Sequence, residues 1–433
     1  VSIGRVRRVG VGVGLQAGQA ITFGTVTTVG AQNAAQWDLH ASLVLEERNL
    51  FDRLVRARLE IRPRVVFAMP LFNFAQPLDP PLGLQVNASW RWPSFLEPRT
   101  NLLVTTRYDL GPMPFTNFFR SELDAAIGPE RSFFAGRLYA GVFVHGNWFL
   151  PADRQPIEAR DRLPEMGALW LEEVVRLDLR DNPSQPTEGA FFSVSSHQSV
   201  QPLSSWDLVR FTAEARGYIP LPLGMVLAGR FQIGIMQVFG SQIASDNVYE
   251  LSRLGPPALQ LTGGGASSNR GYLPGLAGDA EQVYVSLPRS DAALADGAPI
   301  TSRPVRITAG NYLWDASIEL RIPITTAFGV VLFTDAGDID RFRLQGADTQ
   351  PIFRFDHPQF TFGFGIRYRT DIGPFRLDVG IRPDELQFLS QTSQLPPTCT
   401  TTSADRCRPA SFVSFFDLFR FPGAFHLTIG EAF

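Results

Sequence analysis

The 433-residue sequence contains no lysine, so all 39 basic residues are arginine. The 42 acidic residues balance them to a formal net charge of -3. No stretch forms a basic tract, which argues against a nucleic-acid partner. The sequence also lacks any run near the roughly 18 consecutive apolar residues that a membrane-spanning helix needs. A helical membrane protein is therefore excluded.

Cysteine is scarce. The only two, Cys399 and Cys407, lie in the segment PPTCTTTSADRC. This spacing favours a disulfide formed in an oxidising, extracytoplasmic compartment. The five histidines are scattered and have no cysteine or acidic neighbours at metal-ligand spacing, and no catalytic set of Ser, His and Asp can be assembled. We therefore expect no metal, no cofactor and no enzymatic activity.

Apolar residues are plentiful but dispersed. They make up 44% of the chain, and 35 of them are Phe. In the segment QFTFGFGIRYRT at 359–370, apolar residues alternate with polar residues and glycine, which places them on opposite faces of a strand. The segments at 313–322 and 373–382 alternate in the same way. One face of each strand suits lipid and the other suits water.

These alternating runs are about ten residues or longer, which fits tilted strands that cross a bilayer. A soluble sandwich also alternates, but its strands average about five to six residues. Strands in hydrocarbon must close on themselves. The predicted fold is all-β: a single transmembrane antiparallel β-barrel of about 16 strands. We expect these strands near 5–16, 35–46, 54–68, 84–94, 100–109, 114–127, 132–146, 166–180, 188–200, 205–218, 223–238, 311–323, 328–339, 359–371, 373–383 and 424–433.

The connections are of two kinds. Tight turns such as 220–224 and 371–374 alternate with long insertions at about 239–310 and at 384–423. In bacterial barrels the short turns face the periplasm and the long loops face outward. Residues 1–433 are thus predicted to form one barrel domain in the cell outer membrane, with both cysteines in an outer loop.

Four segments, in order, resemble motifs of the outer-membrane assembly-factor superfamily, which contains BamA, TamA and the transporters of two-partner secretion. They are DLRDNP at 178–183 with PTEG at 186–189, GGGASSNRGY at 263–272, FTDAGD at 333–338 with the strand pair at 363–374, and the terminal segment FHLTIGEAF at 425–433. The resemblance covers 178–433. Asn269 and Asp371 depart from the family pattern, which usually has Val or Ile and Pro there. No periplasmic POTRA domain is present in this sequence, and we expect any export signal to precede Val1.

The resemblance implies that the loop at about 239–310 folds into the barrel lumen. Arg270 would form its tip and would pair with Asp335, with Glu319 nearby on the preceding strand. Gly271 would let the backbone approach the wall closely, and Tyr272 would pack and hydrogen-bond. The alternative is that Arg270 is a solvated loop residue.

The resemblance also implies a lateral seam between the first and last strands. Glycine alternates with valine in the first strand, so few side chains hold its ladder. An opened seam would expose a strand edge to which a client strand can add. Alternatively, the glycines only relieve curvature. The expected seam residues are Val9, Gly10, Val11, Gly12, Val13, Leu427, Ile429 and Phe433.

The resemblance therefore predicts a factor that folds or inserts β-barrel clients into the outer membrane. Its expected partners are the lipid bilayer, unfolded β-barrel proteins and periplasmic or lipoprotein accessory subunits. Two alternatives stay open. One is a two-partner-secretion transporter that passes an unfolded exoprotein through the barrel, and the other is a passive pore or structural barrel.

Overall fold

A computed structural model of the chain consists almost entirely of β-strands in one sheet of 17 strands. The description that follows covers residues 6–17, 21–24, 37–50, 54–67, 82–112, 119–152, 164–243, 251–272, 277, 310–340, 355, 358–369, 375–383 and 423–429. No helix in this part of the chain is long and apolar enough to cross a membrane.

The strands run in chain order around the sheet, and all ladders are antiparallel. The first nine are β1 (Val6–Ala17), β2 (Ile21–Gly24), β3 (Trp37–Leu50), β4 (Val55–Phe67), β5 (Leu82–Trp92), β6 (Thr100–Pro112), β7 (Phe119–Phe133), β8 (Leu138–Pro151) and β9 (Met166–Asp178). The other eight are β10 (Gly189–Ser199), β11 (Trp206–Pro220), β12 (Val226–Ser241), β13 (Tyr312–Pro323), β14 (Phe328–Asp340), β15 (Gln359–Tyr368), β16 (Phe375–Ile381) and β17 (Gly423–Ile429).

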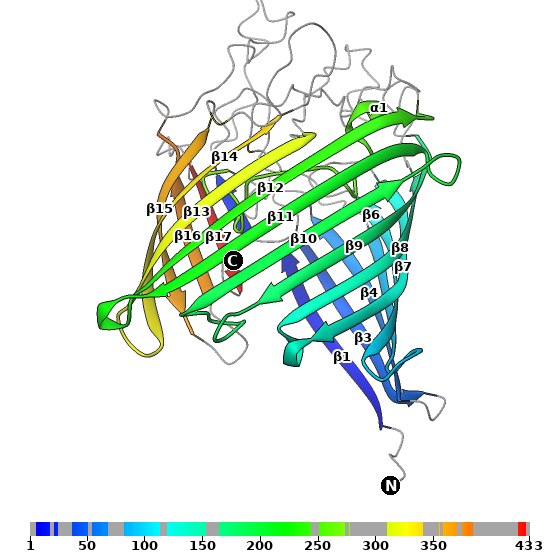
Figure 1. The fold of residues 1–433 in the computed structure, drawn as a ribbon, viewed down its shortest axis with the longest axis horizontal. Helices are drawn as coiled ribbons and strands as arrows, with labels where there is room; N and C mark the ends of the chain where they lie inside the picture. Colours follow the sequence, from blue (N-terminus) through cyan, green and yellow to red (C-terminus); the bar gives the residue numbers. More distant parts are fainter. Residues whose placement is uncertain are drawn as a thin grey trace, which may run out of the picture.

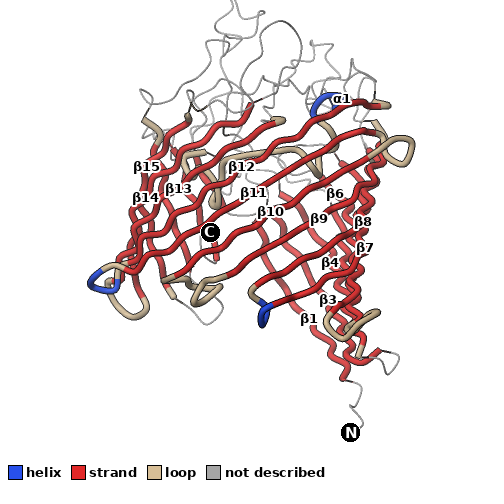
Figure 2. Tube along the Cα trace, in the orientation of Figure 1, coloured by secondary structure: helices blue, strands red, loops and turns tan. Residues whose placement is uncertain are grey.

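The sheet curves round into a barrel (Figures 1 and 2). From β3 to β17, each strand pairs with the next strand in the chain. At the ends of this series, β1 pairs with β3 and the four-residue β2 pairs with β17. Because only three residues separate β1 from β2, the predicted number of about 16 strands agrees with the fold.

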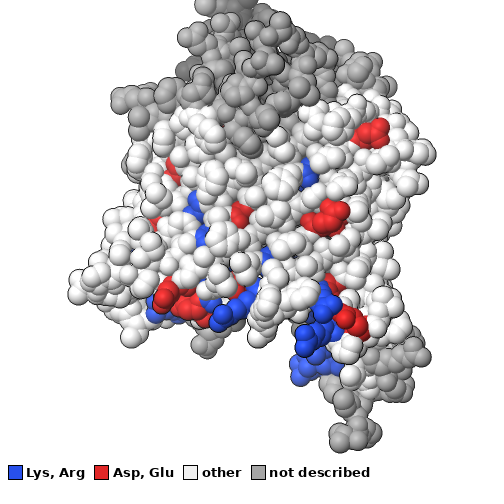
Figure 3. All heavy atoms as spheres, viewed as in Figure 1, with Lys and Arg blue, Asp and Glu red and all other residues white. Residues whose placement is uncertain are grey.

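The barrel wall is apolar outside and polar inside. In β15, Phe362, Phe364 and Ile366 are exposed, whereas Thr361 and Arg367 are buried. This is the face pattern that the alternation predicts. On the side shown in Figure 3, charged side chains gather near the lower edge, and few lie on the middle of the outer wall. The predicted β-barrel is confirmed.

Two details of the predicted strands were wrong. The expected strands at 114–127 and 132–146 place a turn at 128–131, but β7 continues to Phe133 and the chain turns at a short 3-10 segment, Phe134–Gly136. A proline inside a strand removes only one donor, and Pro129 still lies opposite Leu102 of β6. The short strand β2 was not predicted, because four residues are too few to show a periodic pattern.

The connection between β12 and β13 carries the site described below. It begins with a short helix, α1 (Leu251–Leu254), that contacts β12. Further along, Leu261 forms an isolated bridge with Gly310. Leu261 also packs with Leu313 and Ile339 in a small buried cluster, which ties this loop to the wall at β13 and β14.

Candidate functional site

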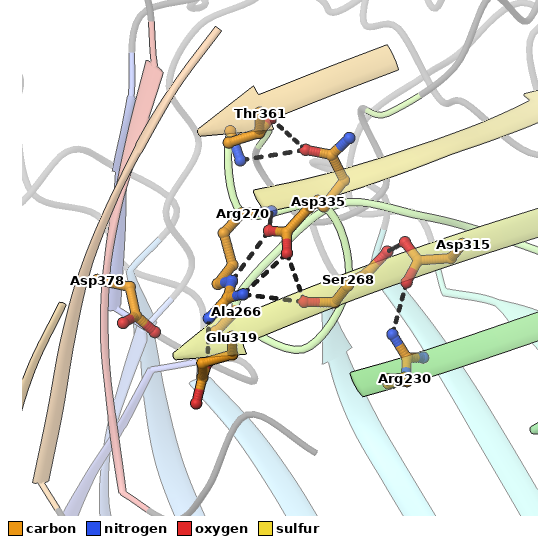
Figure 4. Close-up of polar contacts among 12 residues, drawn as sticks. Arg230, Ala266, Ser268, Arg270, Asp315, Glu319, Asp335, Thr361 and Asp378 are labelled. Carbon is orange, nitrogen blue, oxygen red and sulfur yellow. Dashed lines mark hydrogen bonds and ion pairs between the residues drawn. The ribbon is translucent and has the colours of Figure 1, made fainter. Parts of the chain in front are cut away.

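The loop tip at 263–272 is a compact turn built by glycine. Gly264 and Gly265 have positive φ values of 90° and 95°, a conformation that side chains with Cβ disfavour. The turn is closed by hydrogen bonds from the Gly265 amide to the Tyr272 carbonyl (2.9 Å) and from the Ser268 amide to the Gly265 carbonyl (3.2 Å). This geometry projects Arg270 onto the inner barrel wall (Figure 4).

Arg270 is buried, with 1% of its surface exposed. Its Nε and Nη2 donate to the two oxygens of Asp335, at 2.9 and 2.8 Å, and its Nη1 donates to Oε2 of Glu319 at 2.7 Å. The Arg270 main-chain amide also donates to Asp335 (2.9 Å). Bidentate pairing of this kind fixes the guanidinium in one orientation. The structure thus places Arg270 against Asp335 and Glu319, away from solvent.

The wall strands present these partners because of their period of two. Ser317 and Glu319 are two residues apart on β13 and face inward, and Ser317 lies directly opposite Asp335 on β14. The Ser317 hydroxyl donates to Asp335 (2.6 Å) and accepts from Arg270 Nη2 (3.0 Å). Phe333, two residues before Asp335, lies under the guanidinium, with its ring centre 3.4 Å from Cζ. The carboxylates of the wall and the face of the Phe333 ring therefore bind the same guanidinium group.

Gly271 lies where no side chain fits. A Cβ atom there would be 2.1 Å from Oγ1 of Thr361 on β15. Tyr272 is buried, its hydroxyl donates to the Gln359 side chain, and its ring lies 4.6 Å from Cζ of Arg382. The loop tip therefore contacts β15 as closely as β13 and β14.

Beyond Arg270, alternating charges extend along the inner wall. Glu319 also accepts from Arg321 Nε (2.8 Å) and lies 3.5 Å from Arg367 Nη2. Arg367 donates in turn to Asp378 on β16 (2.6 Å), which also pairs with Arg376 (2.9 Å). The loop tip thus completes a polar network that spans four strands, β13 to β16.

The loop tip also reaches the last strand. Nε2 of His426, a buried residue of β17, lies 2.9 Å from the main-chain oxygen of Arg270, and as the donor of this pair it carries the proton. Gly380 of β16 makes room for this contact, because a Cβ there would be 2.2 Å from the same oxygen. One residue of the tip is therefore bonded to β13, β14 and β17.

The segment at 178–189 builds a turn at the opposite end of the strands. Arg180 Nε and Nη2 donate to the two carboxylate oxygens of Asp178, at 2.8 and 2.7 Å. Asp181 accepts from the Thr187 amide (3.0 Å), the Thr187 hydroxyl (2.6 Å) and the Glu188 amide (3.2 Å). These hydrogen bonds outweigh desolvation, which acts in the other direction, and lower the pKa of Asp181 to about 2.

The structure pairs the first and last strands differently from the sequence prediction. β17 pairs with β2, Leu427 lying opposite Ile21, and the Val9–Val13 segment of β1 pairs only with β3. The predicted pairing of 9–13 with 427–431 was therefore wrong. The register explains this: Leu427 is opposite residue 21, so each step toward Val9 needs one further residue of the last strand. Phe433 and the pair Cys399 and Cys407 lie outside the described residues, as does the side chain of Ile429.

Residues 171–396, just over half of the chain, match the family described as the Omp85 superfamily domain. The chain belongs to the Omp85 superfamily. This confirms the resemblance indicated by the four motifs, and it places the chain among outer-membrane β-barrels that act in protein insertion or secretion. Comparison with curated protein sequences gave no significant match.

The chain is also similar in fold to a solved structure, and weaker similarities to two others were found. BamA from Haemophilus ducreyi lacking POTRA domains 1–3 superposes with a TM-score of 0.57 at 15% identity, covering 89% of this chain and 68% of that one. CdiB from Acinetobacter baumannii gives 0.45 at 12% identity, with 87% and 63% covered. CdiB from Escherichia coli gives 0.44 at 11%, with 83% and 59% covered. This chain thus spans less than two thirds of either CdiB chain.

Several residues of this Omp85 site were missed from sequence. Asn269, a departure from the family pattern, donates to the Gln359 carbonyl (2.7 Å) and accepts from the Thr361 hydroxyl (2.5 Å). His426 was set aside because it has no metal-ligand spacing. Alternation in β16 and β17 puts Asp378 and His426 on the inner face, so the face could have been predicted, but the contact with a loop 156 residues away could not. Among the described residues, no group of three His, Cys, Asp or Glu side chains is arranged to hold a metal.

Proposed function

We propose that this Omp85 barrel resides in the outer membrane and catalyses the folding and insertion of β-barrel clients through the edge of its first strand. The observation that carries the proposal is the second edge of β1. In the described part of the chain, β1 pairs with β3 on one side and with no strand on the other. A free edge offers a row of main-chain donors and acceptors to an incoming strand.

Side-chain exposure supports a free edge. Val9, Val11 and Val13 are 70%, 81% and 82% exposed. Their outward-facing neighbours on β3, which has a strand on each side, are much less exposed: Leu39, Leu43 and Leu45 lie between 37% and 47%. The valines therefore lack the cover that a second neighbouring strand provides.

The closing ladder is short as well. The described pairing of β17 with β2 comprises four residue pairs, whereas β11 and β12 share fifteen. Because hydrogen-bonded pairs add up along a ladder, the β17–β2 ladder is, among those described, the easiest one to separate. Separation there would lengthen the free edge of β1 into β2.

The proposal includes clients and helpers. Unfolded β-barrel proteins would add strands to the edge, and periplasmic or lipoprotein subunits would deliver them. Lipid would meet the apolar outer wall. A secretion transporter passes its cargo through the lumen, and here the buried tip at 263–272 occupies the inner face of β13 to β17. The absence of enzymatic activity stays a prediction.

A disulfide across the closing ladder tests the proposal. Cysteines at Ile21 and Leu427, which lie directly opposite each other, would lock the ladder in a background with Cys399 and Cys407 replaced by serine. We expect the oxidised protein to lose most client insertion into liposomes and to recover it on reduction. A matched pair at Ala213 and Ile233, across β11 and β12, should have no effect. Equal insertion by the locked and reduced forms would contradict lateral opening.

A further inference from the structure

Three arginines lie side by side across the inner wall of β3, β4 and β5. Arg48 is directly opposite Arg56, and Arg56 is directly opposite Arg91. Like charges in directly opposed positions of a sheet are destabilising. One register step higher, Arg8 of β1 and Arg58 of β4 flank Glu46 of β3. We call Arg8, Arg48, Arg56, Arg58 and Arg91 the arginine cluster.

The cluster faces the lumen. Arg56 and Arg58 share their face of β4 with Arg64, which forms a salt bridge with the buried Asp109 of β6. Figure 3 shows basic side chains gathered over the lower ends of β1, β3 and β4. This is the end of the barrel where β3 turns into β4 and where β1 begins (Figure 1).

The nearby carboxylates do not cancel the charge at the surface. Arg58, Arg91 and Arg48 have side chains that are 53%, 49% and 45% exposed. Their acidic partners lie deeper, with Glu60 10% and Glu130 4% exposed. The guanidinium groups therefore cover the carboxylates and present positive charge to the lumen.

Two members of the cluster form no salt bridge with a described residue, although Arg8 lies directly opposite Glu46. Within the described part of the chain, no carboxylate forms an ion pair with Arg8 or Arg56, whereas Arg48 binds Glu46 (2.7 Å) and Arg91 binds Glu130. The polar contacts of the loop tip in the described part of the chain are with β13 to β17, on another part of the wall. Opposed like charges destabilise the row, and the described contacts of the chain show no internal use for it.

The cluster borders the free edge of β1. Arg8 lies on β1 itself, and Val6 is the β1 residue opposite Arg48. In a strand paired along this edge, alternate side chains would point into the lumen. Two of them would lie beside Arg8 and in line with the row of Arg48, Arg56 and Arg91. Carboxylates at these positions would meet unpaired guanidinium groups at close range.

We propose that the arginine cluster selects the incoming strand, and that the preferred client strand carries acidic side chains at the lumen-facing positions beside Arg8 and Val6. This proposal rests on the proposed function, because it takes β1 as the docking edge. It adds the chemical class of the client: an extended segment, apolar on one face, with carboxylates on the other face near one end.

Binding of synthetic strands tests the selection. Three labelled ten-residue peptides of alternating pattern would differ only at two polar positions near one end, which carry Glu, Gln or Lys. Fluorescence anisotropy with the detergent-solubilised protein should show the Glu peptide binding roughly tenfold more tightly than the Lys peptide at low salt. The preference should shrink as salt screens the charges.

Charge reversal provides the matched variants. The double variant Arg8→Glu/Arg56→Glu should reverse the order and favour the Lys peptide. Arg7→Glu is the control, because Arg7 is exposed on the opposite face of the same strand and pairs with Glu47. Reversal in the double variant alone supports the proposal. A similar reversal in Arg7→Glu would show that any charge change near this end of β1 alters the peptide preference, and it would overturn the proposal.

Other outcomes separate the two proposals. Equal binding of all three peptides would leave β1 as a docking edge and overturn the selection by charge. Absence of binding by every peptide would overturn the selection, while the disulfide lock at Ile21 and Leu427 would still report on lateral opening. Displacement of the Glu peptide by phosphatidylglycerol micelles as effectively as by unlabelled peptide would assign the cluster to a lipid headgroup instead.

Discussion

Arg270 combines three interactions that each depend on its planar guanidinium. It pairs with both oxygens of Asp335, bonds to Glu319 and lies on the ring of Phe333. A lysine has a single ammonium on a flexible chain and would satisfy one of these at a time. The residue thus joins a loop to two wall strands in one fixed geometry.

Replacing Arg270 with alanine should leave Asp335 and Glu319 buried near each other without this cation. Breaking a buried ion pair on one side typically costs about 3–5 kcal/mol. We expect Arg270→Ala to lower the free energy of unfolding, measured by urea denaturation, by that amount and to reduce client insertion, and Arg270→Lys to recover only part of either. Arg99, an exposed turn residue, offers a control whose replacement should change neither. Full activity of Arg270→Ala would contradict the role of the tip.

Asp181 gives the turn between β9 and β10 a specific pH dependence. The pKa of its carboxyl is about 2 in the folded chain, below the ordinary value of 3.8 for an aspartate. A lowered pKa stabilises the folded turn above the unfolded value, and this contribution is lost as the pH falls through about 2. Hydrogen-exchange protection of the Thr187 and Glu188 amides should therefore decrease between about pH 4 and pH 2. Asp181→Ala should show the lower protection throughout, and wild-type protection that is flat with pH would refute the assignment.

At the scale of elements, β17 is held from two directions. Its ladder with β16 and β2 holds the main chain, and His426 bonds to the tip loop through the Arg270 carbonyl. Loss of the second contact should therefore loosen the loop and the last strand together.

His426→Ala should increase hydrogen exchange both at 424–427 and at 264–272, because each segment loses the same hydrogen bond. Mass spectrometry of peptides covering the two segments would measure this. Thr428→Ala is the matched control, since Thr428 is the next inward-facing residue of β17 and lies opposite Arg376. Faster exchange confined to one segment, or seen equally in the control, would contradict a direct link.

The elements differ in how far the sequence could predict them. Strands such as β15 have long alternating runs whose side chains decide the face locally, so their ranges and faces were predictable. The β7–β8 turn was misplaced because Gly128-Pro129 carries a turn signal that strand pairing on β6 overrides. The seam was misplaced because register depends on the tilt of all the strands together, a property that no single segment contains.

At the scale of the whole molecule, the polarity of a soluble protein is reversed. Buried residues of the wall include Glu60, Asp109, Glu319 and Asp378, while exposed ones include Leu332 and Phe364. Such an arrangement needs an apolar medium outside the wall and explains why charge is compatible with burial here.

An arginine on the outer wall should therefore be costly, and one on the inner wall tolerated. Leu332→Arg places a charge at a half-exposed outer position of β14 and should destabilise the barrel in lipid by about 2–4 kcal/mol. Gln85→Arg adds the same group on the lumen side of β5, beside Asp109 on the neighbouring strand, and should cost much less. Folding titrations in lipid vesicles would compare them. If the two variants lost equal stability, neither the outer nor the inner face of the wall would lie in hydrocarbon.

The contact between His426 and the Arg270 carbonyl joins positions 156 residues apart, so it forms only once the final strand has docked. Long-range contacts of this kind are the slowest to appear during folding. If folding stopped before β17 docked, the loop tip at 263–272 would lack its hydrogen bond to His426. In such an intermediate the loop would be more accessible to proteases. Docking of β17 is therefore required before the loop tip can make its full set of contacts with the wall.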